Sequence, residues 1–124
     1  MDTRMNVSLV RVDGPKRIFA ATCERGVGLT DSCGTAMTAS TTAQYLSGLC
    51  PGGEEIAVYN RGGMVRCRVE PAADSLSTRL TGNATFETEG RLEWTGPQLR
   101  FGTLKAYDDE RETYRRFVAQ VTNG

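Results

Sequence analysis

A cysteine, a glycine and a threonine stand together at the predicted start of a helix. They are Cys33, Gly34 and Thr35, and either Asp31 or Ser32 is expected to cap the helix. The first N–H groups of a helix lack backbone partners and carry partial positive charge, so a thiol beside them ionises more easily than a free thiol. The same N–H groups can bind an anion such as a carboxylate. The spacing therefore predicts a reactive thiol beside a carboxylate site; the alternative is an inert, buried cysteine.

The composition narrows the chemistry further. The 124 residues include no histidine, which excludes Ser–His and Cys–His catalysis and every His-ligated metal site. The other cysteines are Cys23, Cys50 and Cys67, and no two of the four cysteines have the C-x-x-C spacing of a zinc or redox motif. We therefore predict no metal site, with a zinc ion held by four thiolates as the alternative. We interpret the other three thiols as structural, on two strands and at a helix end.

Charge and hydropathy exclude some partners. Fifteen Lys and Arg residues balance fifteen Asp and Glu residues, and they fall on both halves of the chain. This pattern indicates neither a nucleic-acid surface nor a membrane surface. No apolar run approaches the roughly 20 residues of a membrane span. Residues 1–4 lead directly into a predicted strand and do not form a signal peptide, so we expect a cytoplasmic protein without disulfides.

Two strands and a helix must position the cysteine. Alternating residues predict strands over 5–12 and 17–23, joined as a hairpin, and a glycine turn follows at 26–28. A helix is expected over 34–49, ended by Pro51-Gly52-Gly53. Because this helix has so few charged residues, we expect it to be enclosed on several sides. Its predicted apolar stripe is Ala36, Ala39, Ala43 and Leu46.

The second half of the chain predicts more strands and a last helix. The strands are expected over 54–59, 64–70, 76–81, 85–94 with an interruption at Gly90, and 99–104. A helix is predicted over 108–121, with an apolar stripe formed by Tyr114, Phe117, Val118 and Val121. We expect this stripe to dock on the domain's own sheet. The pattern predicts an α+β domain: a mostly antiparallel sheet wrapped around one central helix, with a C-terminal amphipathic helix.

Two motifs in this order resemble the diaminopimelate epimerase family. They are Glu24-Arg25-Gly26-Val27-Gly28 and, after a short gap, Cys33-Gly34-Thr35. Asn6, eighteen residues before Glu24, the hairpin segment 59–67 and the segment 82–86 also match the family pattern. The sequence departs from that pattern at Leu29, Ala36 and Asn83, which bear on loop shape more than on chemistry.

The resemblance implies a part of a larger enzyme. Members of the family interconvert LL- and meso-2,6-diaminopimelate, for lysine and peptidoglycan synthesis, without a cofactor. They have two similar lobes, each with one catalytic cysteine, and the amino-acid substrate lies between them. Residues 1–124 resemble the C-terminal lobe as a single domain, most strongly over 6–94, with 95–124 as a C-terminal extension. The partners implied are the N-terminal lobe and, because members are often homodimers, a second copy; the lone fragment is expected to be inactive.

The resemblance also implies a role for each site residue. Cys33 is the catalytic acid or base of this lobe, and Gly34 and Thr35 hold the substrate α-carboxylate. Glu24 accepts from an ammonium group and modulates the pKa of the cysteine, while Arg25 holds a carboxylate. Asn6 binds the distal end of the substrate. The alternatives are a surface ion pair for Glu24 and Arg25, and an edge residue for Asn6.

Two other functions stay open. Proline and hydroxyproline racemases share the fold and a Cys-Gly-Thr-Gly motif. In those enzymes the cysteine follows a segment of the Asp-Arg-Ser-Pro type, and this sequence has no such segment. A non-catalytic binding domain with this fold would need no reactive thiol, so the reactivity of Cys33 separates it from the enzymes.

Overall fold

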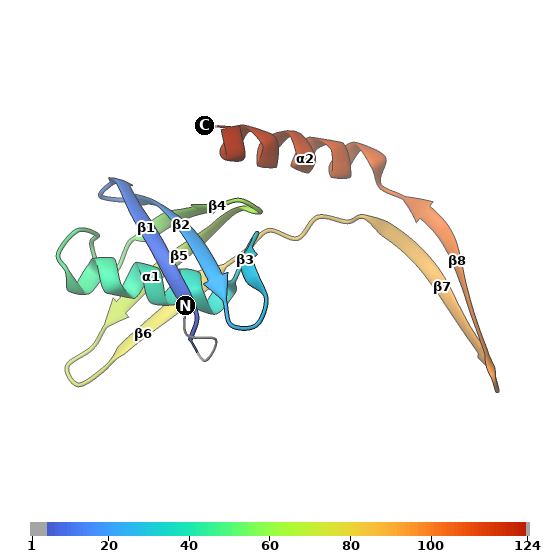
Figure 1. Cartoon of the computed structure of the whole chain (residues 1–124), viewed down its shortest axis with the longest axis horizontal. Coiled ribbons are helices and arrows are strands. Elements are labelled where there is room, and N and C mark those ends of the chain that lie inside the picture. Colours follow the sequence, from blue (N-terminus) through green and yellow to red (C-terminus); the bar gives the residue numbers. More distant parts are fainter. Residues whose placement is uncertain (1–4, 124) are drawn as a thin grey trace.

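The structure is a computed structural model that describes residues 5–123; residues 1–4, expected to lead into the first strand, lie outside this range. Two sheets and two helices form an α+β fold (Figure 1). The larger sheet has the order β1-β2-β4-β5-β6, with β3 beside β2, and the smaller is the pair β7-β8. The elements in chain order are β1 (Val7–Gly14), β2 (Arg17–Glu24), β3 (Gly28–Thr30), α1 (Gly34–Leu46), β4 (Glu55–Asn60), β5 (Gly63–Pro71), β6 (Leu76–Thr81), β7 (Thr88–Thr95), β8 (Gln98–Ala106) and α2 (Asp108–Asn123).

The larger sheet and α1 form one body. Strand β2 pairs in parallel with β4, and the chain makes this crossover through α1; the other ladders within residues 5–123 are antiparallel. Helix α1 contacts β1, β2, β4, β5 and β6. The hydrophobic core lies between helix and sheet and is formed by Ile18, Ala20, Met37, Cys50, Ile56, Val58 and Cys67. The predictions of an α+β class and of a mostly antiparallel sheet are therefore confirmed.

The buried face of α1 differs from the predicted stripe. Ala36, Met37, Ser40 and Thr41 are buried, whereas Ala39, Ala43 and Leu46 are exposed. The sheet covers only one side of the helix, so these three side chains are not part of the core. Thr41 is buried without cost because its hydroxyl donates to the Met37 carbonyl at 2.9 Å. The opposite side of α1, made of small side chains, faces a groove.

The start of α1 also corrects a prediction. Cys33 itself is the N-cap, with extended backbone (φ −145°, ψ 109°), and its carbonyl accepts from the Met37 N–H at 3.0 Å. Neither Asp31 nor Ser32 caps the helix. The Asp31 carbonyl instead accepts from the Gly62 N–H at 2.9 Å, which holds this segment against the β4–β5 turn.

The helix ends at Leu46, three residues before the predicted end at residue 49. Gly48 has φ of 78° and its N–H donates to the Tyr45 carbonyl at 3.0 Å. A left-handed glycine of this kind stops an α-helix, so the Pro51-Gly52-Gly53 segment follows the end and does not cause it.

The predicted glycine turn is confirmed, and a strand after it was missed. Gly26 and Gly28 have φ of 75° and 94°, which favours glycine. The turn folds the chain back so that β3 pairs with β2, with Gly28 opposite Glu24. Three residues are too few for the alternation that identifies a strand in a sequence.

Strands β7 and β8 form a hairpin that projects from the body (Figure 1). Its ladder shifts register between Glu89 and Gly90, which confirms the predicted interruption as a β-bulge. The observed strand β7 begins at Thr88, so residues 85–87 of the predicted strand lie outside it. Within residues 5–123, β7 and β8 contact each other and no other helix or strand.

Helix α2 returns from the hairpin to the body and contacts β4 and β5 (Figure 1). Its predicted apolar stripe is half-buried there, and the Tyr114 hydroxyl donates to the Gly62 carbonyl at 2.8 Å. The expected docking on the domain's own sheet is thereby confirmed.

Candidate functional site

Cys33 is half-buried and lies where the chain enters α1. Its sulfur lies 3.6 Å from the Thr35 hydroxyl. Within the described range, no side chain forms a capping hydrogen bond at this helix start. Gly34 and Thr35 are exposed, so the first N–H groups of α1 are turned to the surface beside a thiol. This arrangement can bind an anion next to a proton-transferring sulfur.

Asn6 and Arg25 are joined directly. The Arg25 N–H donates to the Asn6 side-chain oxygen at 2.7 Å. The ladder of β1 and β2 explains this contact, because Val7 is opposite Cys23 and the residues just beyond that pair meet. The bond uses one lone pair of the Asn6 side-chain oxygen and fixes the orientation of the amide, and the NH₂ group can donate to a ligand.

Asn6 and Thr35 line the same groove, which lies between β1 and α1 and has a volume of about 680 Å³. The fold thus unites residues separated by a hairpin, a turn and a strand. Cys33, Gly34, Glu24 and Arg25 do not line this groove. Cys33 is connected to it through Thr35, and Arg25 through Asn6. Glu24 lies at the end of β2, half-buried, beside Arg25.

Asn60 contacts the segment on both sides of Cys33, and the sequence pattern placed Asn60 only within the hairpin segment 59–67. It is 4% exposed. Its NH₂ group lies 3.5 Å from the Ser32 hydroxyl and 2.6 Å from the Met37 sulfur, and its carbonyl oxygen accepts from the Gly62 N–H at 2.8 Å. A buried amide that bonds both flanks of a cysteine positions that cysteine. The sequence offered one signal for this role, a polar residue at the end of the largely apolar strand Glu55–Asn60.

The remaining thiols lie in different environments. Cys50 and Cys67 are buried, and Cys23 is half-buried. Burial raises the pKa of the Cys50 thiol. Burial also raises the pKa of the Cys67 thiol, more than the hydroxyls of Thr41 and Thr38 lower it. A thiol held protonated in a core is a poor base, which fits the structural role predicted for these two.

Two further features are missing from residues 5–123. No group of three or more Cys, Asp or Glu side chains is placed to hold a metal ion. No helix in the same range combines the length and the hydropathy needed to cross a membrane.

Three sequence relatives of this chain belong to one class of enzyme, the epimerases. They are diaminopimelate epimerases. The chain is 39% identical over 110 residues to that of Clostridium acetobutylicum, which covers 88% of this chain and 33% of the relative. It is 48% identical over 85 residues to that of Lactiplantibacillus plantarum (66% and 26%), and 34% identical over 118 residues to one from Listeria monocytogenes (94% and 36%). No protein-family model matches the chain.

These findings confirm the resemblance inferred from the motifs: the chain is related to diaminopimelate epimerases over most of its own length. The chain spans about a third of the length of the curated relatives it matches. About two thirds of such an enzyme therefore has no counterpart in this sequence.

Proposed function

We propose that this chain is the C-terminal catalytic lobe of a diaminopimelate epimerase. The main support for the proposal is the sequence identity of 39% over 110 residues to an enzyme of that name. The thiol at a helix start without a side-chain capping hydrogen bond supports it, because this geometry suits removal of a proton beside a carboxylate.

Cys33 acts in this proposal as one of two acid–base cysteines. As a thiolate, Cys33 removes the α-proton from one face of the substrate, and a thiol from the missing N-terminal lobe donates a proton to the opposite face. After inversion each sulfur holds the protonation state that the other began with. The reverse reaction then runs with the roles exchanged, so the pair needs no cofactor.

The helix start binds the α-carboxylate. The N–H groups of Gly34 and Thr35, with the Thr35 hydroxyl, would face this group. Negative charge develops on the carboxylate as the α-proton leaves, so fixed donors stabilise the transition state more than the bound substrate.

The strand ends bind the remainder of the substrate. Glu24 accepts from an ammonium group and adjusts the proton affinity of the catalytic thiol, and Arg25 binds a carboxylate. Asn6 donates its NH₂ group to the distal end, because its oxygen is already held by the Arg25 N–H. In this proposal the ends of β1 and β2 and the start of α1 all contact one substrate molecule.

The complete enzyme would enclose α1. We propose that the sheet there wraps around this helix, because in the present chain the exposed Ala39 and Ala43 line an open groove with β1. The missing part would close that groove and supply the second cysteine. The isolated chain would be inactive, since it holds half of the acid–base pair.

Proton exchange tests the proposal. The chain is joined to the N-terminal part of the Clostridium acetobutylicum relative and incubated with diaminopimelate in D₂O. We expect deuterium at the α-carbon together with inversion, and at least a roughly 1000-fold loss of both in Cys33→Ala. Cys23→Ala, another half-buried thiol at a strand, is the matched control and should retain activity. If the joined protein folds but shows no exchange of the α-proton, the proposal is wrong.

A further inference from the structure

The β7–β8 hairpin has one apolar face that nothing in the described structure covers. Leu92 is opposite Phe101, and Trp94 is opposite Leu99, so the four side chains share one face. They are 63%, 67%, 78% and 66% exposed in that order. Large side chains gathered in this way mark an interaction surface.

The other face of the hairpin carries charged side chains. Arg91 and Glu93 form an ion pair at 3.3 Å, and Glu93 is opposite Arg100. The hairpin therefore has one face suited to water and one suited to packing. This amphipathic pattern is typical of a strand pair that lies on another protein layer.

The hairpin is also too small to be stable by itself. A lone two-stranded hairpin is at best marginally stable in water and needs further strands or a helix on its apolar face. Helix α2 follows β8 directly but packs on β4 and β5, and it does not contact the hairpin strands. The stabilising layer must come from outside residues 5–123.

We infer that the apolar face of the hairpin docks on the part of the enzyme that this chain lacks, an inference that rests on the proposed function. The match to the Listeria monocytogenes relative covers 94% of this chain, which leaves too few residues to exclude the hairpin. The hairpin is therefore part of the matched region in a protein that has about twice as much additional sequence.

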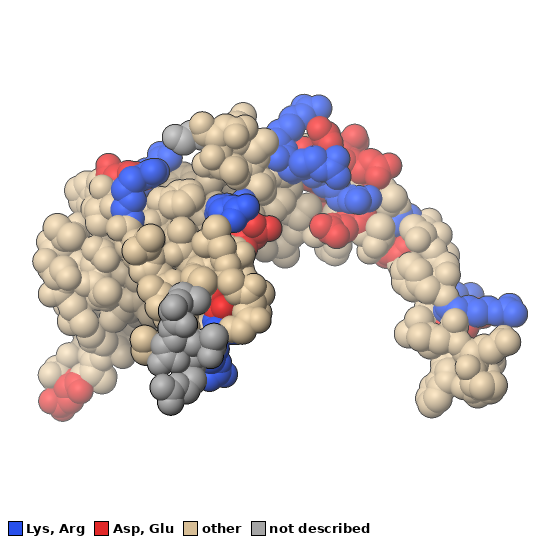
Figure 2. All heavy atoms as spheres, viewed as in Figure 1, with Lys and Arg blue, Asp and Glu red and all other residues tan. Residues whose placement is uncertain are grey.

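The shape of the chain indicates where the missing part sits. A hollow opens under α2, between the body and the hairpin (Figure 2). Strand β3 and the N-terminal end of α1 lie on the side of the body that faces the hairpin (Figure 1). A protein layer in this hollow would contact the hairpin and lie beside the start of α1, where the proposed mechanism requires a second thiol opposite Cys33. Two copies joined through their hairpins would cover the apolar face but bring no second acid–base group to Cys33.

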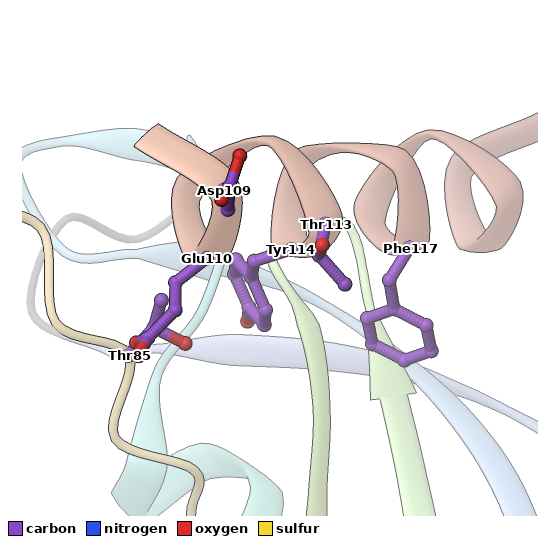
Figure 3. Close-up of a pocket in the computed structure, with 6 residues that line it drawn as sticks. All are labelled: Thr85, Asp109, Glu110, Thr113, Tyr114 and Phe117. Atoms are coloured by element: carbon purple, nitrogen blue, oxygen red, sulfur yellow. The ribbon is translucent and has the colours of Figure 1, made fainter. Parts of the chain in front are cut away.

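A pocket at the base of the hairpin extends this surface. It has a volume of about 370 Å³ and lies under the first turns of α2. Tyr114 and Phe117 point down from α2, while Thr85 and Glu110 lie at the other end (Figure 3). Glu110 accepts from the Phe86 N–H at 3.0 Å, which fixes the segment leading into β7 to α2. An apolar side chain of the missing part fits this pocket.

Hydrogen exchange measured by mass spectrometry tests the inference. Peptides covering residues 88–106 are followed in the isolated chain and in the chain joined to the N-terminal part of the Clostridium acetobutylicum relative. We expect fast exchange in the isolated chain and at least about tenfold slower exchange in the joined protein. The double variant Leu92→Ser, Phe101→Ser should lose this slowing, whereas Glu93→Ser, Arg100→Ser on the polar face should keep it.

The outcomes separate this inference from the proposed function. Cys33-dependent deuterium exchange of diaminopimelate with an unprotected hairpin would overturn the inference alone. A protected hairpin without that activity would leave the docking intact and overturn the function. Protection that rises with concentration in the isolated chain would assign the face to a second copy and overturn the inference.

Discussion

The four thiols of this chain differ in how far the fold shields them. Cys23 and Cys33 are half-buried, at the end of a strand and at the entry to a helix. Cys50 and Cys67 are buried in the core, where burial raises the pKa of each thiol. Because alkylation requires an accessible thiolate, the fold itself sets an order of reactivity.

We expect iodoacetamide at neutral pH to modify Cys33 and Cys23 at least about 100-fold faster than Cys50 and Cys67 in the folded chain. Peptide mass spectrometry gives the rate at each position, and the difference should disappear in urea. In the joined protein, diaminopimelate should slow the labelling of Cys33 and leave Cys23 unchanged. Equal protection of Cys23, or none at Cys33, would contradict the proposed role.

At the residue scale, the sequence could predict the identity of the reactive centre more readily than its geometry. Cys33-Gly34-Thr35 was recognised by spacing, and the structure places it at a helix start. The capping residue was not predictable because it depends on the Gly62 N–H, which binds the Asp31 carbonyl from a distant turn. The bond from Arg25 to Asn6 likewise depends on strand register.

At the element scale, one glycine allows α2 to dock. Gly63, at the start of β5, has φ of +135°, a conformation that L side chains rarely adopt. A Cβ atom there would overlap the Tyr114 hydroxyl. That hydroxyl donates to the Gly62 carbonyl, and the Gly62 N–H in turn donates to the Asp31 carbonyl, near Cys33. The turn between β4 and β5 thus connects the last helix to the candidate site.

Gly63→Ala should therefore loosen α2. We expect a loss of about 1–3 kcal/mol in the free energy of unfolding, from backbone strain and overlap, with faster hydrogen exchange over 108–123. Gly14→Ala is the matched control, because its Cβ atom meets nothing within 4 Å and its φ lies outside the left-handed region. If both variants have the same stability in urea and the same hydrogen exchange over 108–123, the docking of α2 through Tyr114 does not depend on a glycine at position 63.

Most elements were predictable because their patterns are local. Alternation identified β1 and β2, the strands β4, β5 and β6 were also predicted, and the apolar stripe identified α2. The buried face of α1 was not predictable, since small residues such as Ala39 and Thr41 differ too little in hydropathy to show which side of the helix meets the sheet. The parallel pairing of β2 with β4 is likewise a long-range property that no local pattern encodes.

At the scale of the whole molecule, three surfaces are open to a partner of the kind proposed above. The groove beside α1, the hollow under α2 and the apolar face of the hairpin are open in a chain that spans a third of its relatives. The formal net charge is zero, so the net charge supplies no long-range attraction to a partner. Shape and apolar area would then determine how the missing part fits.

Substitution of Ala43 tests whether the complete enzyme encloses α1. Ala43 is exposed in the groove, so Ala43→Glu should change the free energy of unfolding of the isolated chain by no more than about 0.5 kcal/mol. In the joined protein the same carboxylate would be buried without a partner, and we expect a loss of about 2 kcal/mol or more. Ala73→Glu, in the exposed turn between β5 and β6, is the control for added charge and should be neutral in both proteins. Urea unfolding of all four variant proteins gives the comparison. Equal tolerance of Ala43→Glu in the two contexts would show that this side of α1 stays open, and the missing part would then have to bind through the hollow and the hairpin alone.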